Sequence, residues 1–102
     1  MLELRPICEN CGILLPPEST EARICSFECT FCRTCVEGRL GNVCPNCGGG
    51  FVPRPIRPQK NWRDENYLGK YPATTQKKHR PVDLEGHKHF AEKIYPLLPE
   101  KR

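Results

Sequence analysis

The sequence lacks a long hydrophobic run and an N-terminal export signal. No stretch approaches the roughly 20 apolar residues that a membrane-spanning helix needs. Met1–Pro6 has no basic start followed by an apolar segment. These absences argue against secretion and against a membrane partner, so we expect a cytoplasmic protein. In a reducing compartment, closely spaced cysteine pairs predict metal ligands rather than disulfides.

The sequence also has too few apolar residues for a large core. Only 37% of its 102 residues are hydrophobic, and 11 are proline. A domain this small usually needs disulfides, a metal or a partner to stay folded. Eight cysteines, all between Cys8 and Cys47, can supply that cohesion. The apolar side chains expected to pack around them are Ile7, Ile13, Leu15, Ile24, Phe27, Phe31, Val36, Leu40, Val43 and Phe51.

The cysteines form four pairs, which supply two tetrahedral all-thiolate sites with no ligand left over. The first and last pairs are followed by Gly12 and Gly48. This is the zinc-knuckle form, in which glycine gives the tight turn its backbone freedom and the backbone amides point at the sulfurs. The pairs are Cys8 and Cys11, Cys25 and Cys29, Cys32 and Cys35, and Cys44 and Cys47.

The third pair runs directly into a predicted helix. Val36–Leu40 follows Cys35, and Gly41 and Asn42 provide an end. Two ligands at the first turn of a helix, facing two from a knuckle, make the treble-clef arrangement. The helix N-terminus also favours the negative charge of a zinc–thiolate cluster.

Two ways of sharing the pairs between two zinc ions remain open. In the crossed arrangement, the first and third pairs share one ion and the second and fourth share the other. In the sequential arrangement, neighbouring pairs share an ion. We favour the crossed one because only Thr30 and Phe31 separate the second pair from the third. It assigns Cys8, Cys11, Cys32 and Cys35 to site 1, and Cys25, Cys29, Cys44 and Cys47 to site 2.

An iron–sulfur centre is the main rival to zinc. Cys29-x2-Cys32-x2-Cys35 resembles an iron–sulfur run, but the next cysteine follows after eight residues rather than three, so the bacterial ferredoxin spacing fails. A redox Cys-x2-Cys is disfavoured because no thioredoxin-like strand and helix pattern surrounds any pair. A disulfide network is the weakest interpretation.

The second half of the chain predicts a separate region. The prolines of Phe51–Pro58 suit an extended segment rather than a helix or a central strand. We therefore expect a two-zinc head at residues 1–58 and a basic, Pro-rich, weakly structured tail at 59–102. A short helix near 83–95 is predicted, capped by Asp83 and limited by later prolines. We expect the three tail histidines to be solvated, namely His79, His87 and His89.

Charge divides the chain in the same way. Up to Val52 there are four arginines and six glutamates, whereas from Pro53 onward there are twelve basic and six acidic residues. We favour a tail that packs on the head or stays solvated, its aromatics covering apolar surface. The alternative is nucleic-acid binding by Arg54, Arg57, Lys60, Arg63, Lys77, Lys78 and Arg80, with Trp62, Tyr67 and Tyr71 interspersed.

The head resembles a RING finger. The resemblance lies in the order of the cysteines, Phe31 before Cys32, the helix after Cys35, and the ending Cys44-Pro45-x-Cys47, with Cys29 in place of the usual histidine. It implies a small metal-bound α+β fold with a cross-brace of two zinc sites, a short helix and short strands. In ubiquitin-ligase RING fingers, an apolar residue inside the first pair and a basic residue after the last cysteine grip the conjugating enzyme. Those places hold Glu9, Asn10 and Gly48 here, and only Pro45 matches, which argues against a ligase.

A closer resemblance joins the segments Leu15-Pro16-Pro17, Ala22–Cys32 and Val43–Gly49. They are similar to a small bacterial family of cysteine-rich proteins of unknown function. This resemblance covers about residues 1–58 and implies zinc binding in a bacterial cytosol. The head has no Ser/His/Asp or Cys/His constellation, and thiolates saturated by zinc have little catalytic use. We therefore expect a non-enzymatic zinc module that contacts an unidentified protein partner.

Overall fold

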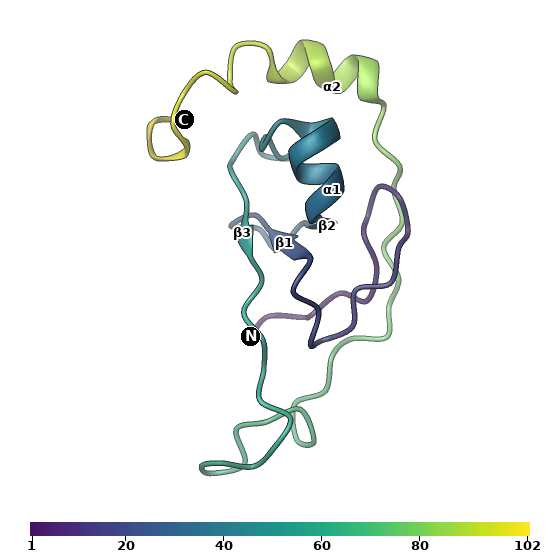
Figure 1. Ribbon diagram of the computed structural model, residues 1–102, viewed down its shortest axis with the longest axis vertical. Coiled ribbons are helices and arrows are strands. Elements are labelled where there is room, and N and C mark those ends of the chain that lie inside the picture. The colour runs from purple at the N-terminus through teal and green to yellow at the C-terminus, as the bar shows by residue number, and fades with distance from the viewer.

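A small antiparallel sheet with strand order β2-β1-β3 lies at the centre of the fold. The computed structural model describes all residues, 1–102. β1 (Ala22–Ile24) and β2 (Thr30–Cys32) form a hairpin in which Ala22 lies opposite Cys32 and Ile24 opposite Thr30 (Figure 1). β3 (Val52–Pro53) pairs with the other side of β1. Proline is tolerated in β3 because this strand is at the edge of the sheet.

A short helix follows β2 without a loop. α1 (Arg33–Cys35) continues into the π-helical turn η1 (Val36–Leu40). Gly41 and Asn42 end the helix, with φ angles of 60° and 57° in the left-handed region. The predicted helix is therefore confirmed. The third cysteine pair lies at its first turn, as expected: Cys32 caps the helix and its sulfur accepts a hydrogen bond from the Cys35 amide.

The core consists of cysteines with a few large apolar side chains between them. Phe31 is fully buried and packs edge-on against the half-buried Phe51, with ring centroids 5.5 Å apart. Two expected core residues are instead exposed, Ile13 at 56% and Phe27 at 71%. Phe27 lies in the turn between Cys25 and Cys29, where the backbone amide of Phe27 faces the Cys25 sulfur and the side chain faces outward. Ile13 follows the first knuckle, where its carbonyl accepts a hydrogen bond from the Cys8 amide. The other expected core residues are buried or half-buried.

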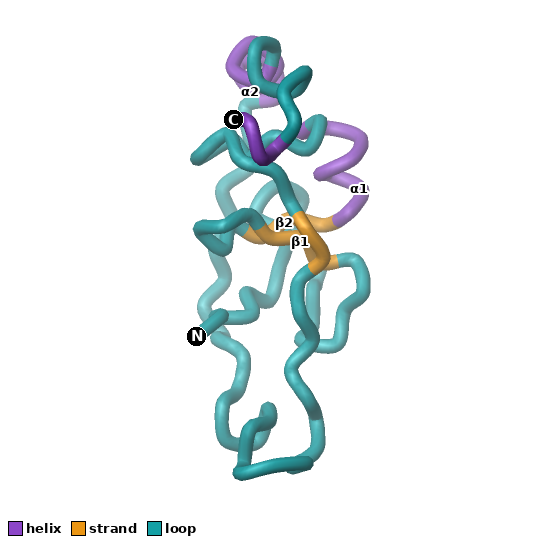
Figure 2. The backbone as a smooth tube through the Cα atoms, turned by 90° about the vertical axis from the view of Figure 1, so that its left-hand side faces the viewer, coloured by secondary structure: helices purple, strands orange, loops and turns teal.

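The tail has little regular structure, but it is bonded to the rest of the chain. After β3 it forms a loop at the far end of the molecule, closed by a hydrogen bond from the Leu68 amide to the Pro58 carbonyl (Figures 1 and 2). It then returns beside the N-terminal segment, where the Thr74 amide bonds the Glu3 carbonyl. α2 (Leu84–Ala91) crosses over α1 and η1, and η2 (Pro99–Lys101) lies near the C-terminus.

The sequence predicts the start of α2 well, whereas the helix ends at Ala91, four residues before the end of the predicted range. Asp83 caps the helix by accepting a hydrogen bond from the Gly86 amide, and the helix ends before Pro96. It therefore lies inside the range predicted for it, whereas the boundary between head and tail at residue 58 stays a prediction. None of the helices has the length and apolar character needed to cross a bilayer.

Arg54 fastens three segments of the chain together. Its guanidinium donates to the carbonyls of Arg5, Leu15 and Pro16 at 2.8, 3.1 and 2.9 Å. The side chain is only 4% exposed, and burial without a carboxylate partner lowers its pKa. The neighbouring Arg57 acts similarly, donating to the carbonyls of Leu2 and Tyr71.

Candidate metal centres

The first sulfur cluster joins the first knuckle to the start of α1. Its four sulfur atoms all lie within 4.8 Å of one another. The sulfurs of Cys11 and Cys32 are 3.8 Å apart. A tetrahedral zinc site with bonds of about 2.3 Å has sulfur–sulfur edges of about 3.8 Å. The donors are therefore spaced for one tetrahedral ion, and they are Cys8, Cys11, Cys32 and Cys35.

The second cluster joins the β1–β2 loop to the last knuckle. The sulfurs of Cys25, Cys44 and Cys47 lie within 4.8 Å of one another. Cys29 lies beside them at the end of the same loop, and its sulfur accepts a hydrogen bond from Asn46. Burial, reinforced by the nearby Cys25, raises its pKa. The structure thus groups the first pair with the third and the second with the fourth, which is the crossed grouping.

The two knuckles have the same backbone geometry. Gly12 and Gly48 both have φ of 78°, and each amide bonds the carbonyl of its first cysteine, at 2.9 and 2.8 Å. A residue with a Cβ is strained at such a φ. Backbone amides also point at the sulfurs: those of Cys11 and Asn46 lie 3.5 Å from the sulfurs of Cys8 and Cys44. The glycine and amide roles expected of the knuckles are both present.

Two asparagines donate hydrogen bonds to sulfur atoms, one in each cluster, a role that the sequence expectations do not include. Asn10 donates its side-chain amide to the Cys35 sulfur at 3.3 Å, and Asn46 donates to the Cys29 sulfur at the same distance. Each bond runs from a knuckle to the cysteine pair that it faces. The signal was present as the repeated pattern Cys-x-Asn-Cys-Gly in both knuckles. Such bonds orient metal ligands and are typical of the surroundings of metal sites.

Cys35 differs electrostatically from its neighbours. Burial opposes its ionisation, but hydrogen bonds from Asn10, Arg39 and two other cysteines together lower its pKa to about 7. Arg39 contributes directly, with a nitrogen 3.1 Å from the sulfur. In contrast, burial raises the pKa of Cys32 to about 12. A bound cation must therefore displace a proton from Cys32, while Cys35 is already a favourable anionic donor near neutral pH.

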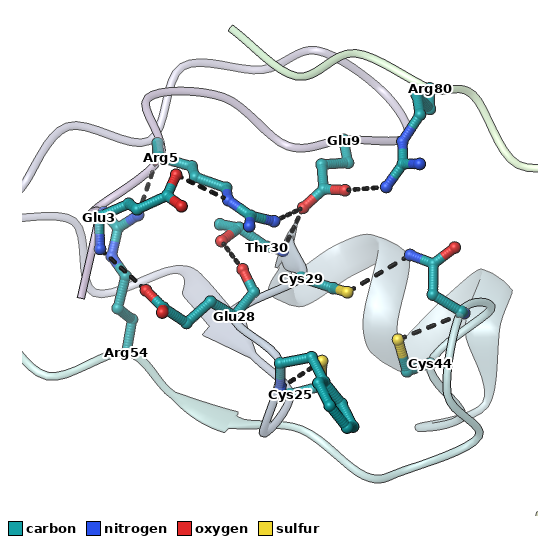
Figure 3. A network of polar contacts seen from close by, with 12 residues as sticks. Glu3, Arg5, Glu9, Cys25, Glu28, Cys29, Thr30, Cys44, Arg54 and Arg80 are labelled. Atoms are coloured by element: carbon teal, nitrogen blue, oxygen red, sulfur yellow. Dashed lines mark hydrogen bonds and ion pairs between the residues drawn. The ribbon is translucent and has the colours of Figure 1, made fainter. Parts of the chain in front are cut away.

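A buried glutamate lies inside the first knuckle (Figure 3). Glu9 is 1% exposed and accepts hydrogen bonds from the Thr30 amide and from the Arg5 side chain, the latter at 3.0 Å. Its other oxygen lies 3.5 Å from Arg80 of the tail. The resemblance to a RING finger placed Glu9 and Asn10 on a partner-facing surface. In the structure Glu9 instead faces inward, and the side-chain amide of Asn10 donates to the Cys35 sulfur.

The histidines are not part of either cluster. His89 is exposed as expected, and His79 is an exposed residue whose Nε2 lies 3.1 Å from the Asn10 carbonyl. His87 was expected to be solvated, and that expectation is wrong. It is 6% exposed, with Nε2 2.9 Å from the Leu40 carbonyl. This contact docks α2 on η1, and because a carbonyl can only accept, Nε2 carries the proton.

Comparison with known proteins places this chain in a family. Residues 1–57, which include all eight cysteines, match the family described as "Protein of unknown function (DUF1272)". An uncharacterized protein of Rhizobium meliloti (strain 1021) is 53% identical over 81 residues, covering 79% of this chain and 89% of that protein. No solved structure matches. The chain, with its two interleaved cysteine clusters, belongs to the DUF1272 family.

Proposed function

We propose that this protein is a structural zinc module that binds two Zn²⁺ ions and presents a surface for protein contacts. The observation that carries the proposal is the spacing of the sulfurs, with a 3.8 Å edge in the first cluster. The ions supply the cohesion that the few apolar side chains do not, because metal binding and folding are coupled in small zinc domains. Site 1 has a treble-clef arrangement, since its ligands come from a knuckle and a helix start.

Zinc suits these donors better than an iron–sulfur centre. All-thiolate tetrahedral sites are typical of structural zinc. The run that resembles an iron–sulfur motif is divided between the clusters, with Cys29 beside one and Cys32 and Cys35 in the other. Four thiolates per ion leave no open coordination position, which supports a role without catalysis. The thiolates must stay reduced, so we place the protein in the cytoplasm.

The surface beside the clusters supports a role in protein contacts. Leu14 is 68% exposed and Phe27 71% exposed, next to the first knuckle and in the β1–β2 loop respectively. Neither side chain is required to shape a sulfur cluster. Contiguous patches of exposed apolar side chains mark protein-binding surfaces, and we propose that Leu14 and Phe27 contribute to one.

Elemental analysis of the purified, reduced protein tests the metal assignment. We expect two zinc ions per chain, and we expect exhaustive chelation to collapse the dispersion of the amide NMR spectrum. Iron in place of zinc, or a native spectrum after chelation, would overturn the proposal. For the contact surface, cross-linking after nuclease treatment should capture a protein that Phe27→Ser no longer captures. Equal capture by both would place the contact elsewhere.

A second candidate function is nucleic-acid binding by the exposed loop of residues 58–71. Lys60 lies over the ring of Trp62 at 5.8 Å, and Trp62 is 75% exposed. Lys70 lies similarly over Tyr71 at 5.6 Å. An exposed aromatic ring beside cations can stack on a base. Arg54 is buried and Arg57 is bonded to backbone carbonyls, so Lys60 and Arg63 lead this candidate site.

The chain has one tryptophan, so its fluorescence reports directly on this loop. Quenching by a single-stranded oligonucleotide that weakens as salt rises would support the second function. Trp62→Ala should then weaken binding in a gel shift. Absence of quenching at low salt, or binding unaffected by Trp62→Ala, would rule out this loop.

A further inference from the structure

A short segment of the tail lies across the first knuckle. We name residues 79–82 the strap. The His79 ring contacts the Asn10 carbonyl at 3.1 Å, and the Arg80 amide donates to the Glu9 carbonyl at 2.8 Å. The Val82 amide donates to the side-chain oxygen of Asn10 at 2.9 Å. The strap thus contacts the backbone carbonyls of Glu9 and Asn10 and the side-chain oxygen of Asn10.

The Val82 bond determines which way the Asn10 side chain faces. A backbone N–H can only donate, so it requires the oxygen of Asn10 on its side. The nitrogen of the same amide then faces the Cys35 sulfur, to which it donates at 3.3 Å. Rotating the amide by half a turn would place its oxygen against the sulfur and lose both bonds. One tail amide therefore selects the orientation that stabilises a thiolate in the first cluster.

The second cluster has no equivalent contact. Asn46 donates to the Cys29 sulfur at 3.3 Å, as Asn10 does to Cys35. The strap donates no hydrogen bond to the side-chain oxygen of Asn46, which is an exposed residue. The tail reaches this knuckle at another point, where Arg102 donates to the Gly48 carbonyl at 3.2 Å. The two knuckles share glycine geometry and sequence pattern, but only the first has its asparagine oxygen bonded by the strap. The second site is thus an internal control for the first.

We propose that the strap is a positioning element for the first metal site, and that the Val82 amide acts through Asn10 on Cys35. The conformation of the strap then sets how firmly the first ion is held, while the second ion does not depend on the strap. The strap lies outside residues 1–57 that match the family. This inference rests on the proposed metal binding and adds a control of one site by the tail.

The test uses the full chain loaded with Cd²⁺, whose two resonances are assigned through their couplings to the cysteine protons. Val82→Pro removes the N–H, and Val82→Ala is the matched control that keeps it. We expect the Val82→Pro variant to release the first ion to a chelator about tenfold faster than the wild type does. Losses of this size are typical when a residue that hydrogen-bonds a metal ligand is removed. The second ion should leave at the wild-type rate, and Val82→Ala should resemble the wild type.

A double-mutant cycle separates this role from general damage. In an Asn10→Ala background, Val82→Pro should add little to the release rate, because the bond it controls is already absent. Independent, multiplicative effects would overturn the proposal, as would wild-type release from Val82→Pro alone. If Val82→Pro does not fold, an amide-to-ester replacement at Val82 removes the same N–H without restricting the backbone. Failure of Cd²⁺ to bind either site would instead refute the proposed function.

Discussion

The buried carboxylate of Glu9 permits a quantitative test of what holds the first knuckle to the sheet. Glu9→Gln keeps the size of the side chain and an oxygen for the Thr30 amide, but it removes the charge opposite Arg5. The side chains of Arg5 and Glu9 are 10% and 1% exposed, so the unpaired cation would stay largely out of water. Breaking one partner of a buried ion pair costs about 3 to 5 kcal/mol. We expect a loss near the lower end of this range, because the hydrogen bond from Thr30 is retained and Glu3 still lies 3.4 Å from Arg5.

The chain contains a matched control with the same spacing. Arg33 and Glu37 are also four residues apart and 3.0 Å from each other, but both are more than half exposed. We expect Glu37→Gln to leave the urea midpoint unchanged, because water and salt screen such a pair. The assay is urea unfolding at saturating zinc, followed by circular dichroism, so that metal loss does not differ between variants. A loss below about 1 kcal/mol for Glu9→Gln would refute the reasoning from burial.

Four other outcomes are expected. Cys32→Ser should abolish binding of the first ion and unfold the head, as measured by metal analysis and amide NMR. A variant that still binds two ions and gives a native spectrum would contradict this. His87→Ala should keep both ions but lower stability by about 1 to 2 kcal/mol, with faster hydrogen exchange in α2. Gly48→Ala should lower the free energy of unfolding, measured by urea denaturation, by about 1 to 2 kcal/mol, because the φ of Gly48 is 78°. Gly38→Ala should raise that free energy slightly, because no atom lies within 4 Å of the added Cβ. The zinc affinity, measured by competition with a chelator, should be lower at pH 6 than at pH 8. The reason is that the ion must displace protons from thiols such as Cys32, whose pKa is about 12. Equal affinities at the two pH values would contradict this.

The local features of the head were predictable because short-range chemistry determines them. Cysteine spacing and the two knuckle glycines indicate tight turns, and Gly41 and Asn42 indicate where a helix ends. The grouping of the pairs was favoured from the two-residue separation of Cys29 and Cys32, which is also a short-range property. These parts of the fold need little knowledge of distant segments.

Long-range burial of polar groups was not predictable in the same way. Glu9 and Arg54 are charged residues in turns or extended segments, where exposure is the usual outcome. Each is buried because partners far along the chain satisfy it: the Thr30 amide donates to Glu9 across 21 positions, and Arg54 donates to the Arg5 carbonyl across 49. His87 is buried for a related reason, since its ring bonds the carbonyl of Leu40, 47 positions earlier, at the end of η1. No periodicity in the sequence indicates such pairings.

The hydrogen bonds of Arg54 predict which residue related proteins keep at this position. Two of its nitrogens reach three carbonyls in two segments, which the single ammonium of a lysine cannot do. Since Arg54 lies within the residues that match the family, relatives that keep this fold should keep arginine at the corresponding position. Residues beyond 57 are under no such constraint from the sheet, so sequence divergence among relatives should concentrate there. An alignment in which lysine freely replaces this arginine would show that the three segments are joined by other means.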